Sequence, residues 1–224
     1  MLVALVAVEL RHFHWPDGSH HLDHVWECVC LVVGGIGVAI RAHVVGHAPA
    51  DTSGRNTERG QVAAVLNTTG LYSVVRNPLY LGNAFMWLGA AMFVRDWRIV
   101  LVATMAFLLV YERVVMAEER FLVEKFNGPY GPRAAATPAF WPRFSGYVRP
   151  NLPFSLRNVL EREYGGTFGF VAVLFAFEIG GDWFYKGEFL VDPIWVGLMG
   201  FSTVAYLTLR TLEKHTRYLH VEGR

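Results

Sequence analysis

Apolar residues gather in long blocks along this chain, and short polar segments separate each block from the next. Five of these blocks approach the roughly 20 residues that a helix needs to cross a bilayer. We expect the spans near residues 25–45, 78–94, 97–116, 165–185 and 193–211. A shorter apolar stretch, residues 1–10, is interpreted as an incomplete or tilted first helix. The pattern therefore predicts an all-α fold, a polytopic bundle of about five transmembrane helices.

The polar segments refine this bundle. Helical periodicity continues beyond the third span to Phe126, so that helix is expected to emerge from the bilayer. Residues 127–153 are rich in proline and glycine and are predicted to form a loop. Residues 156–164 are predicted to form a short amphipathic helix on the membrane surface, separate from the span that follows. No internal repeat is visible, and one domain over residues 1–224 accounts for the chain, ending in a helical pair at residues 165–211.

Glycines mark the places where helices are expected to approach each other closely. Gly34, Gly35 and Gly37 lie in the first clear span, and Gly165 and Gly169 open the fourth. Small residues at such spacings let the backbones of two membrane helices come into contact. We therefore predict tight helix packing at both places.

Composition supports a membrane protein and argues against nucleic-acid binding. The chain is 53% hydrophobic with a formal net charge of +1, and its basic residues flank apolar blocks rather than covering a soluble face. Cys28 and Cys30 lie inside an apolar segment and form neither a disulfide framework nor a zinc pattern. Residues 11–24 hold five histidines, but no carboxylate or thiol spacing completes a standard site. We interpret this segment as an interfacial loop and predict no metal.

The distribution of positive charge predicts the orientation of the bundle. If the ends of the first and third clear spans share one side, that side receives 16 of the 20 lysines and arginines. Only Arg11, Arg95, Arg98 and Lys186 remain on the other side. Positive charge concentrates on the cytoplasmic side of membrane proteins. The sequence thus predicts a multi-pass protein whose polar segment near Arg76 and whose C-terminus face the cytoplasm.

A cluster of polar residues precedes and opens the second span. Asn77 is a favourable N-cap, and Pro78 suits the first turn of a helix because its missing N–H would have no partner there. Arg76 beside this helix N-terminus is a natural position for binding an anionic group. The alternative is a capped membrane helix with an interfacial arginine, which residue types alone do not exclude.

Several ordered motifs carry a resemblance to a known family. They read Gly70-Leu-Tyr, then Arg76-Asn-Pro-Leu-Tyr-Leu-Gly82 and Trp87-Leu-Gly89, followed by Glu118-Glu119-Arg-Phe-Leu, Phe126, Tyr130, Thr137-Pro and Phe140-Trp-Pro142. Over about residues 34–142 the chain resembles the isoprenylcysteine carboxyl methyltransferase and phospholipid N-methyltransferase superfamily. Asn77 replaces a more common histidine, and a second aromatic residue expected shortly after Tyr130 is absent. Because of these two departures, the motifs do not identify the substrate.

The resemblance implies an integral-membrane methyltransferase that uses S-adenosylmethionine in a cytoplasmic pocket and acts on a lipid-like or prenylated acceptor. Arg76 suits the carboxylate of the cofactor, and Glu118 or Glu119 suits its ammonium group or ribose diol. A tyrosine could face the sulfonium by cation–π attraction. The cofactor residues so implied are Tyr72, Arg76, Asn77, Tyr80, Gly82, Glu118, Glu119 and Tyr130, with Arg76 and Glu119 as the catalytic pair.

Three alternatives stay open at this point. Arg55 and Asn56 lie in a turn that could hold the head group of the acceptor, or the turn could simply be exposed. A steroid-reductase-like, NADPH-dependent oxidoreductase shares a related C-terminal pattern, but such enzymes usually show Asn-Tyr-x-Gly-Glu, and here Asn83 follows Gly82. A non-catalytic membrane protein that binds or senses a ligand through the histidine-rich segment is the third possibility.

Overall fold

A computed structural model gives the fold of the chain. It describes residues 20–49, 55–57, 60–62, 65–126, 128, 130–186 and 192–224. The apolar stretch 1–10, interpreted above as an incomplete helix, lies outside these residues, as does most of the histidine-rich segment.

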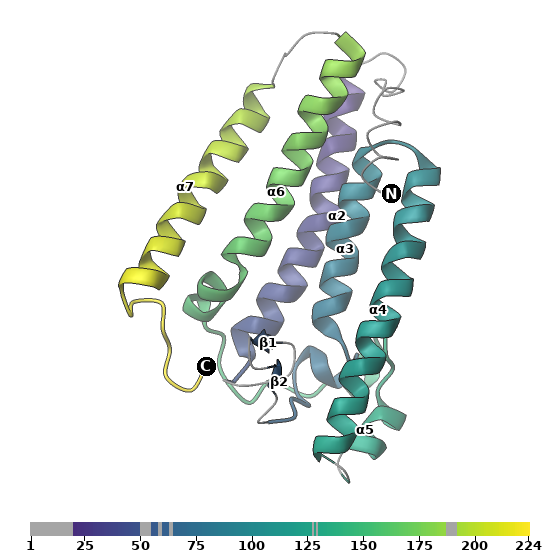
Figure 1. Cartoon of the computed structure of the whole chain (residues 1–224), viewed down its shortest axis with the longest axis vertical. Coiled ribbons are helices and arrows are strands. Elements are labelled where there is room, and N and C mark those ends of the chain that lie inside the picture. Colours follow the sequence, from purple (N-terminus) through teal and green to yellow (C-terminus); the bar gives the residue numbers. More distant parts are fainter. Residues whose placement is uncertain are drawn as a thin grey trace.

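In the part of the chain that the structure describes, five long helices lie side by side and confirm the predicted all-α fold (Figure 1). In Figure 1 they follow one another as α7, α6, α2, α3 and α4 from left to right. Their bounds are His20–His47 for α2, Pro78–Phe93 for α3, Trp97–Phe126 for α4, Leu156–Lys186 for α6 and Pro193–His215 for α7. One end of the bundle, the lower end in Figure 1, also carries the short helix α5 and a small hairpin. The short elements are α5 (Tyr130–Ala136), the antiparallel strands β1 (Arg55–Thr57) and β2 (Gly60–Val62), and the 3-10 turns η3 (Leu71–Ser73) and η4 (Phe144–Gly146).

Among the described residues, three helices are long and apolar enough to cross a membrane. They cover His21–His47, Trp97–Phe126 and Leu156–Phe184. The helix α3 has only 16 residues, so it is about 24 Å long against a hydrocarbon core of about 30 Å. The remaining predicted spans, α3 and α7, are not among these three, and their crossing of the bilayer stays a prediction.

The helices α6 and α5 each correct one sequence prediction. Residues 156–164 do not form a separate surface helix, because α6 runs without a break from Leu156 to Lys186. Their polar face packs on α2 instead: the buried amide of Asn158 donates to the Val45 carbonyl at 2.6 Å, and Glu163 pairs with Arg41. Likewise, the proline- and glycine-rich segment 127–153 is not entirely loop, since it contains α5, whose proline lies in the first turn where it is tolerated.

Glycines bring α2 and α3 into backbone contact. A Cβ on Gly37 would overlap the Gly82 carbonyl oxygen, and a Cβ on Gly89 would lie 2.7 Å from the Cys30 carbonyl oxygen. A Cβ on Gly34 would overlap the Phe170 ring of α6. The predicted close packing is therefore confirmed at Gly34 and Gly37. It is wrong at Gly35, Gly165 and Gly169, where an added Cβ would meet nothing within 4 Å.

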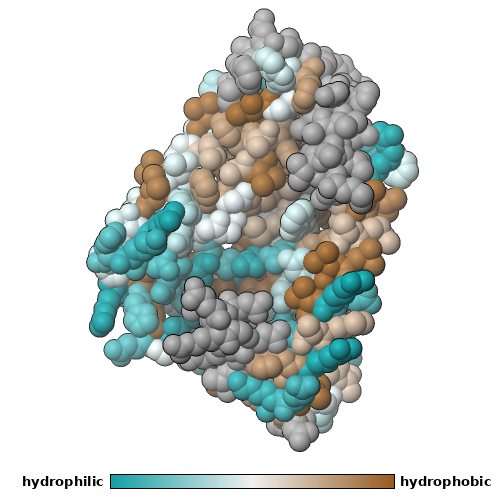
Figure 2. Space-filling model, viewed as in Figure 1, coloured by the Kyte–Doolittle hydropathy of each residue, from teal (hydrophilic) through white to brown (hydrophobic). Residues whose placement is uncertain are grey.

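Side-chain chemistry differs between the two ends of the bundle. On the face shown in Figure 2, hydrophilic side chains gather over the lower half, where α5 and the C-terminus lie, and hydrophobic ones over the upper half. The apolar core lies where four helices meet and consists of Cys30, Phe93, Phe170, Leu174 and Trp195. The polar end is where α3 and α6 begin and where α2, α4 and α7 end.

A cluster of buried polar side chains lies at the opposite end of the bundle. Arg95 forms an ion pair with Asp23, and burial lowers the pKa of its guanidinium to about 10. The Trp195 indole N–H donates to Glu27 at 3.0 Å, and Glu178 is 3% exposed. These contacts join α2, α6 and α7 with the turn between α3 and α4.

Candidate active site

The segment that precedes α3 is held by main-chain hydrogen bonds to the loop after α5. The Gly70 N–H donates to the Val148 carbonyl at 2.8 Å, and the Arg76 N–H donates to the Pro138 carbonyl at 2.9 Å. Gly70 has a φ of +62°, a conformation that glycine adopts without strain. Arg76 is thereby fixed at the N-terminus of α3, next to the helices α4 and α5.

These elements enclose a small polar pocket at the polar end of the bundle. Its walls come from the 70–77 segment and from α3, α4 and α5, and its lining residues are Tyr72, Arg76, Asn77, Leu79, Tyr80, Glu118, Leu122, Tyr130 and Arg133. The enclosed space is about 20 Å³, which is about the room that one water molecule needs. We call this site the polar pocket.

An ion pair bridges the polar pocket. The Arg76 Nη1 lies 3.1 Å from the Glu119 Oε1, and the two side chains are 19% and 26% exposed. The buried Glu119 Oε1 and Arg76 Nε have no hydrogen-bond partner among the described residues. Buried polar atoms without partners cost free energy and are frequent at sites that bind a ligand.

Three further polar contacts complete the walls. The Tyr80 hydroxyl donates to Glu118 at 2.6 Å, and Arg133 donates to the Tyr72 carbonyl at 3.1 Å. Tyr130 is buried beside Arg76, and burial together with the charge of Glu119 raises the pKa of its hydroxyl. Burial lowers the pKa of the Arg133 guanidinium. The pocket thus combines two arginines, two glutamates and three tyrosines in a partly dehydrated space.

The structure brings most of the sequence-predicted cofactor residues together. Six of them line the polar pocket, and Glu119 reaches it through Arg76. Gly82 lies instead in the α2–α3 contact, where its missing side chain gives room to the stem of Arg41. Asn77 is at the N-cap position of α3, but its side chain makes no capping hydrogen bond and donates to the Ala139 carbonyl at 3.4 Å.

Other residues fall outside the pocket or were missed. Arg55 and Asn56 lie in β1, opposite Val62 and Gln61 of β2, and their proposed contact with an acceptor stays a prediction. Sequence reasoning did not assign Arg133 to the site. Its spacing of three residues from Tyr130 on a short helix would have indicated a shared face.

A second polar group crosses the bundle one turn of α3 beyond Tyr80. Arg41 of α2 donates to both carboxylate oxygens of Glu163 on α6, at 2.7 and 2.9 Å. It also donates to the Asn83 side-chain oxygen at 2.7 Å, and the Asn83 amide donates to the Tyr111 hydroxyl at 2.9 Å. We call Arg41, Glu163, Asn83 and Tyr111 the polar chain. It joins four helices.

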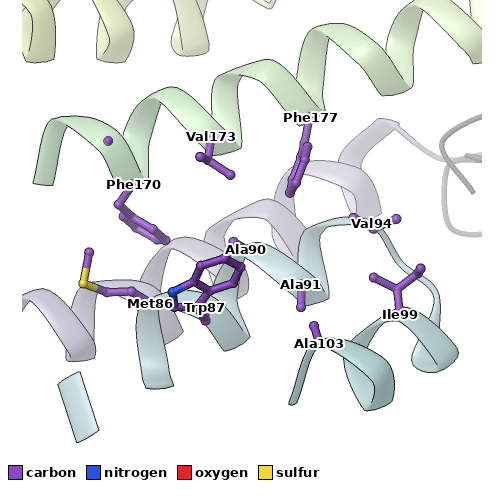
Figure 3. Close-up of a pocket in the computed structure, with 11 residues that line it drawn as sticks. Met86, Trp87, Ala90, Ala91, Val94, Ile99, Ala103, Phe170, Val173 and Phe177 are labelled. Carbon is purple, nitrogen blue, oxygen red and sulfur yellow. The ribbon is translucent and has the colours of Figure 1, made fainter. Parts of the chain in front are cut away.

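Beyond the polar chain, an apolar cavity of about 230 Å³ lies between α3, α4 and α6 (Figure 3). Phe170, Val173 and Phe177 point from α6 toward α3, while Ile99 and Ala103 contribute from α4. The remaining lining residues are Met86, Trp87, Ala90, Ala91, Val94 and Gly169. Two of the lining residues, Trp87 and Val173, are also exposed on the protein surface. We call it the apolar cavity.

Metal-ligating residues do not gather in the part of the chain that the structure describes. No three or more histidine, cysteine, aspartate or glutamate side chains there are placed to hold a metal ion. Within the histidine-rich segment, His24 lies 3.2 Å from Glu27 and 3.3 Å from Asp192.

Comparison with known proteins gives one family match and two relatives. Residues 29–128 match the family model described as phospholipid methyltransferase. The cobalt-zinc-cadmium resistance protein CzcN of Cupriavidus metallidurans is 38% identical over 88 residues, which are 39% of this chain and 40% of that protein. The nickel-cobalt-cadmium resistance protein NccN of Alcaligenes xylosoxydans xylosoxydans is 30% identical over 144 residues, which are 64% of this chain and 61% of that protein. No solved structure matches.

The matched region coincides with the helices that build the site. It contains residues 29–47 of α2, all of α3 and α4, and every glutamate and tyrosine of the polar pocket except Tyr130. The family match confirms the resemblance drawn from the motifs and favours methyl transfer over the reductase alternative. Over residues 29–128 the chain is thus similar to the phospholipid methyltransferase family, in the isoprenylcysteine and phospholipid methyltransferase group.

Proposed function

We propose that this protein transfers a methyl group from S-adenosylmethionine to a lipid-like or prenylated acceptor at the membrane. The observation that carries the proposal is the polar pocket, where Arg76 and Glu119 face each other with buried atoms that lack hydrogen-bond partners. The family match supports the reaction type, and the apolar cavity, which shares the helices α3 and α4 with the polar pocket, supports the acceptor class.

The residues of the polar pocket fit the groups of the cofactor. Arg76 supplies a planar fork of donors for the α-carboxylate, and Glu119 supplies acceptors for the α-ammonium. Glu118 supplies a further carboxylate for the ribose hydroxyls, and Tyr80 lies next to it. When bound, the cofactor supplies a methyl group that is already activated on a sulfonium. The protein has only to align the acceptor and to exclude water.

The pocket has to open before a ligand of this size binds. Its space of about 20 Å³ holds about one water molecule. Binding therefore requires Arg76 and Glu119 to separate and α5 to move away from α4. On binding, Arg76 would pair with the α-carboxylate of the cofactor and Glu119 with its α-ammonium. Neither side chain is then left unpaired in the partly buried site.

A ligand-binding experiment tests the proposal. The full chain, purified in a neutral maltoside detergent, is titrated by calorimetry with S-adenosylhomocysteine, NADPH and Zn²⁺ in separate runs. We expect S-adenosylhomocysteine alone to bind. Binding of NADPH without S-adenosylhomocysteine would favour the reductase alternative. Binding of Zn²⁺ alone would favour a direct metal role such as the relatives' names suggest.

We also propose that the polar end faces the cytoplasm, because most lysines and arginines belong to that end. Single cysteines at Arg98 and Arg217, in a chain whose two natural cysteines are replaced, should react with an impermeant maleimide from opposite sides of the membrane. Arg98 opens α4 at one end of the bundle, and Arg217 follows α7 at the other. Labelling of both from the same side would contradict this topology.

The apolar cavity is expected to bind the chain of the acceptor, and Gly169 offers a way to fill it. Gly169 lines the cavity, and an added Cβ there would meet nothing within 4 Å. Gly169→Leu should therefore fold normally and lower methyl transfer to long-chain acceptors about tenfold or more. Gly165→Leu is the matched control, because Gly165 lies one turn earlier on α6, has equally open surroundings and does not line the cavity. Equal activity of both variants would place the acceptor elsewhere.

A further inference from the structure

The polar chain lies between the polar pocket and the apolar cavity on two helices that line both. Along α3, Tyr80 lines the pocket, Asn83 belongs to the chain and Trp87 lines the cavity. Along α4 the same order is Glu118, Tyr111 and Ala103. On α6, Glu163 of the chain precedes the cavity residues that begin at Gly169. A molecule with its tail in the cavity and its reacting head at the pocket must therefore pass the polar chain.

The hydrogen bonds of the polar chain leave donors available on Arg41, Asn83 and Tyr111. A guanidinium has five N–H donors, and Arg41 uses three of them on Glu163 and Asn83. Asn83 uses one of its two amide N–H groups on Tyr111, whose hydroxyl accepts that bond and keeps its own proton to donate. A set of unused donors suits a ligand group that only accepts hydrogen bonds, namely an oxyanion.

The contact with Glu163 orients Arg41 for this task. Glu163 binds Arg41 through two parallel hydrogen bonds, which hold the plane of the guanidinium in one position. The Glu163 side chain is only 7% exposed, whereas that of Arg41 is 21% exposed, so part of the Arg41 side chain is accessible from outside. Ionisable groups within membrane helices are costly and often functional.

We propose that the polar chain binds an anionic oxygen group of the acceptor, a phosphate or a carboxylate adjoining the atom that receives the methyl group. The identification of this ligand as the methyl acceptor rests on the proposed function, but the binding of an anionic amphiphile is measurable without any turnover. Arg41, Asn83 and Tyr111 donate to the oxyanion, and Glu163 is a positioning residue.

The test compares amphiphiles that share one chain and differ in charge. Dodecyl phosphate, dodecanoate and dodecyltrimethylammonium are titrated into the full protein in a neutral maltoside detergent, and inorganic phosphate serves as the anion without a chain. We expect the two anionic amphiphiles to bind and the cationic one to bind at least about tenfold more weakly, since a charge-assisted hydrogen bond is worth about that factor. Inorganic phosphate alone should not bind measurably at the same concentrations.

Variants separate anion binding from a structural role of the ion pair. Arg41→Gln leaves the buried Glu163 carboxylate without its partner and could unfold the bundle. The double variant Arg41→Gln/Glu163→Gln keeps a neutral hydrogen-bonded pair, so it should fold and should lose about tenfold or more in affinity for dodecyl phosphate. Arg210→Gln is the matched control, because Arg210 contacts Tyr206 on the exposed side of α7, away from the polar chain.

The remaining outcomes decide the matter in either direction. Unchanged affinity in the double variant, or equal binding of the anionic and cationic amphiphiles, would overturn the inference. If the double variant fails to fold, Tyr111→Phe removes a single hydroxyl and should still weaken dodecyl phosphate binding severalfold, and unchanged affinity there would overturn it too. S-adenosylhomocysteine binding is measured on the wild type and on every variant. If the wild type does not bind it, the proposed function is contradicted. If the wild type binds it but does not prefer anionic amphiphiles, only this inference is contradicted.

Discussion

Replacing Arg76 by alanine is expected to weaken S-adenosylhomocysteine binding about tenfold to a hundredfold, and so is replacing Glu119. Each change leaves one charge of the ligand without its partner in a partly buried pocket. A charge-assisted hydrogen bond contributes about 1.5–3 kcal/mol, which corresponds to this loss in affinity. Calorimetric titration of the purified variants measures it.

Two neighbouring residues provide matched controls for this pair. Arg120 follows Glu119 on α4 but is exposed, and Glu112 lies exposed on the same helix two turns earlier. Alanine at either position should leave the affinity unchanged. Arg76→Lys should recover only part of the loss, because an ammonium lacks the planar two-donor fork. Wild-type affinity in both Arg76→Ala and Glu119→Ala, with unchanged unfolding temperature, would place the cofactor outside the polar pocket.

The second large effect is expected from Gly37→Ala in the α2–α3 contact. The new methyl group would overlap the Gly82 carbonyl oxygen and lie 2.8 Å from the Met86 backbone nitrogen. Backbone atoms of a helix cannot move aside as a flexible side chain does, so α2 and α3 must separate. We expect a loss of about 1–3 kcal/mol or more in stability, the usual cost of overpacking. Thermal unfolding in detergent, followed by circular dichroism, measures the loss.

Gly35→Ala is the control for this prediction, because it makes the same chemical change two residues away on α2. An added Cβ at Gly35 would meet nothing within 4 Å. The substitution should leave the unfolding temperature unchanged or raise it slightly, since alanine favours a helix over glycine by about 1 kcal/mol. Equal behaviour of the two variants would mean that α2 and α3 do not pack through Gly37.

Local signals made α3, α4 and much of the polar pocket predictable from the sequence. Pro78 fixes the start of α3, and the unbroken helical pattern through Phe126 fixes the end of α4. Tyr72, Arg76 and Tyr80 are close in sequence, and Glu118 and Glu119 are neighbours on one helix. Their motif spacing therefore carried enough information to group them before any fold was known.

Long-range contacts explain what the sequence could not predict. The pairing of Arg41 with Glu163 joins residues 122 positions apart, and neither residue lies in a recognisable motif. The same contact explains why α6 continues through residues 156–164, because the polar face that indicated a membrane surface is buried against α2. Gly165 and Gly169 look like packing residues in the sequence, but an added Cβ at either would meet nothing within 4 Å among the described residues.

The shortness of α3 has a consequence for the lipids around the protein. In Figure 1, α4 extends well beyond the polar end of α3, and α3 itself is only 16 residues long. A hydrophobic segment shorter than the hydrocarbon core thins the bilayer next to it, at a modest cost for each ångström of mismatch. The leaflet beside α3 is therefore expected to dip toward Tyr80 and Arg76. Lipid head groups would then lie at the same depth as the polar pocket, so a lipid could reach the pocket without leaving the membrane.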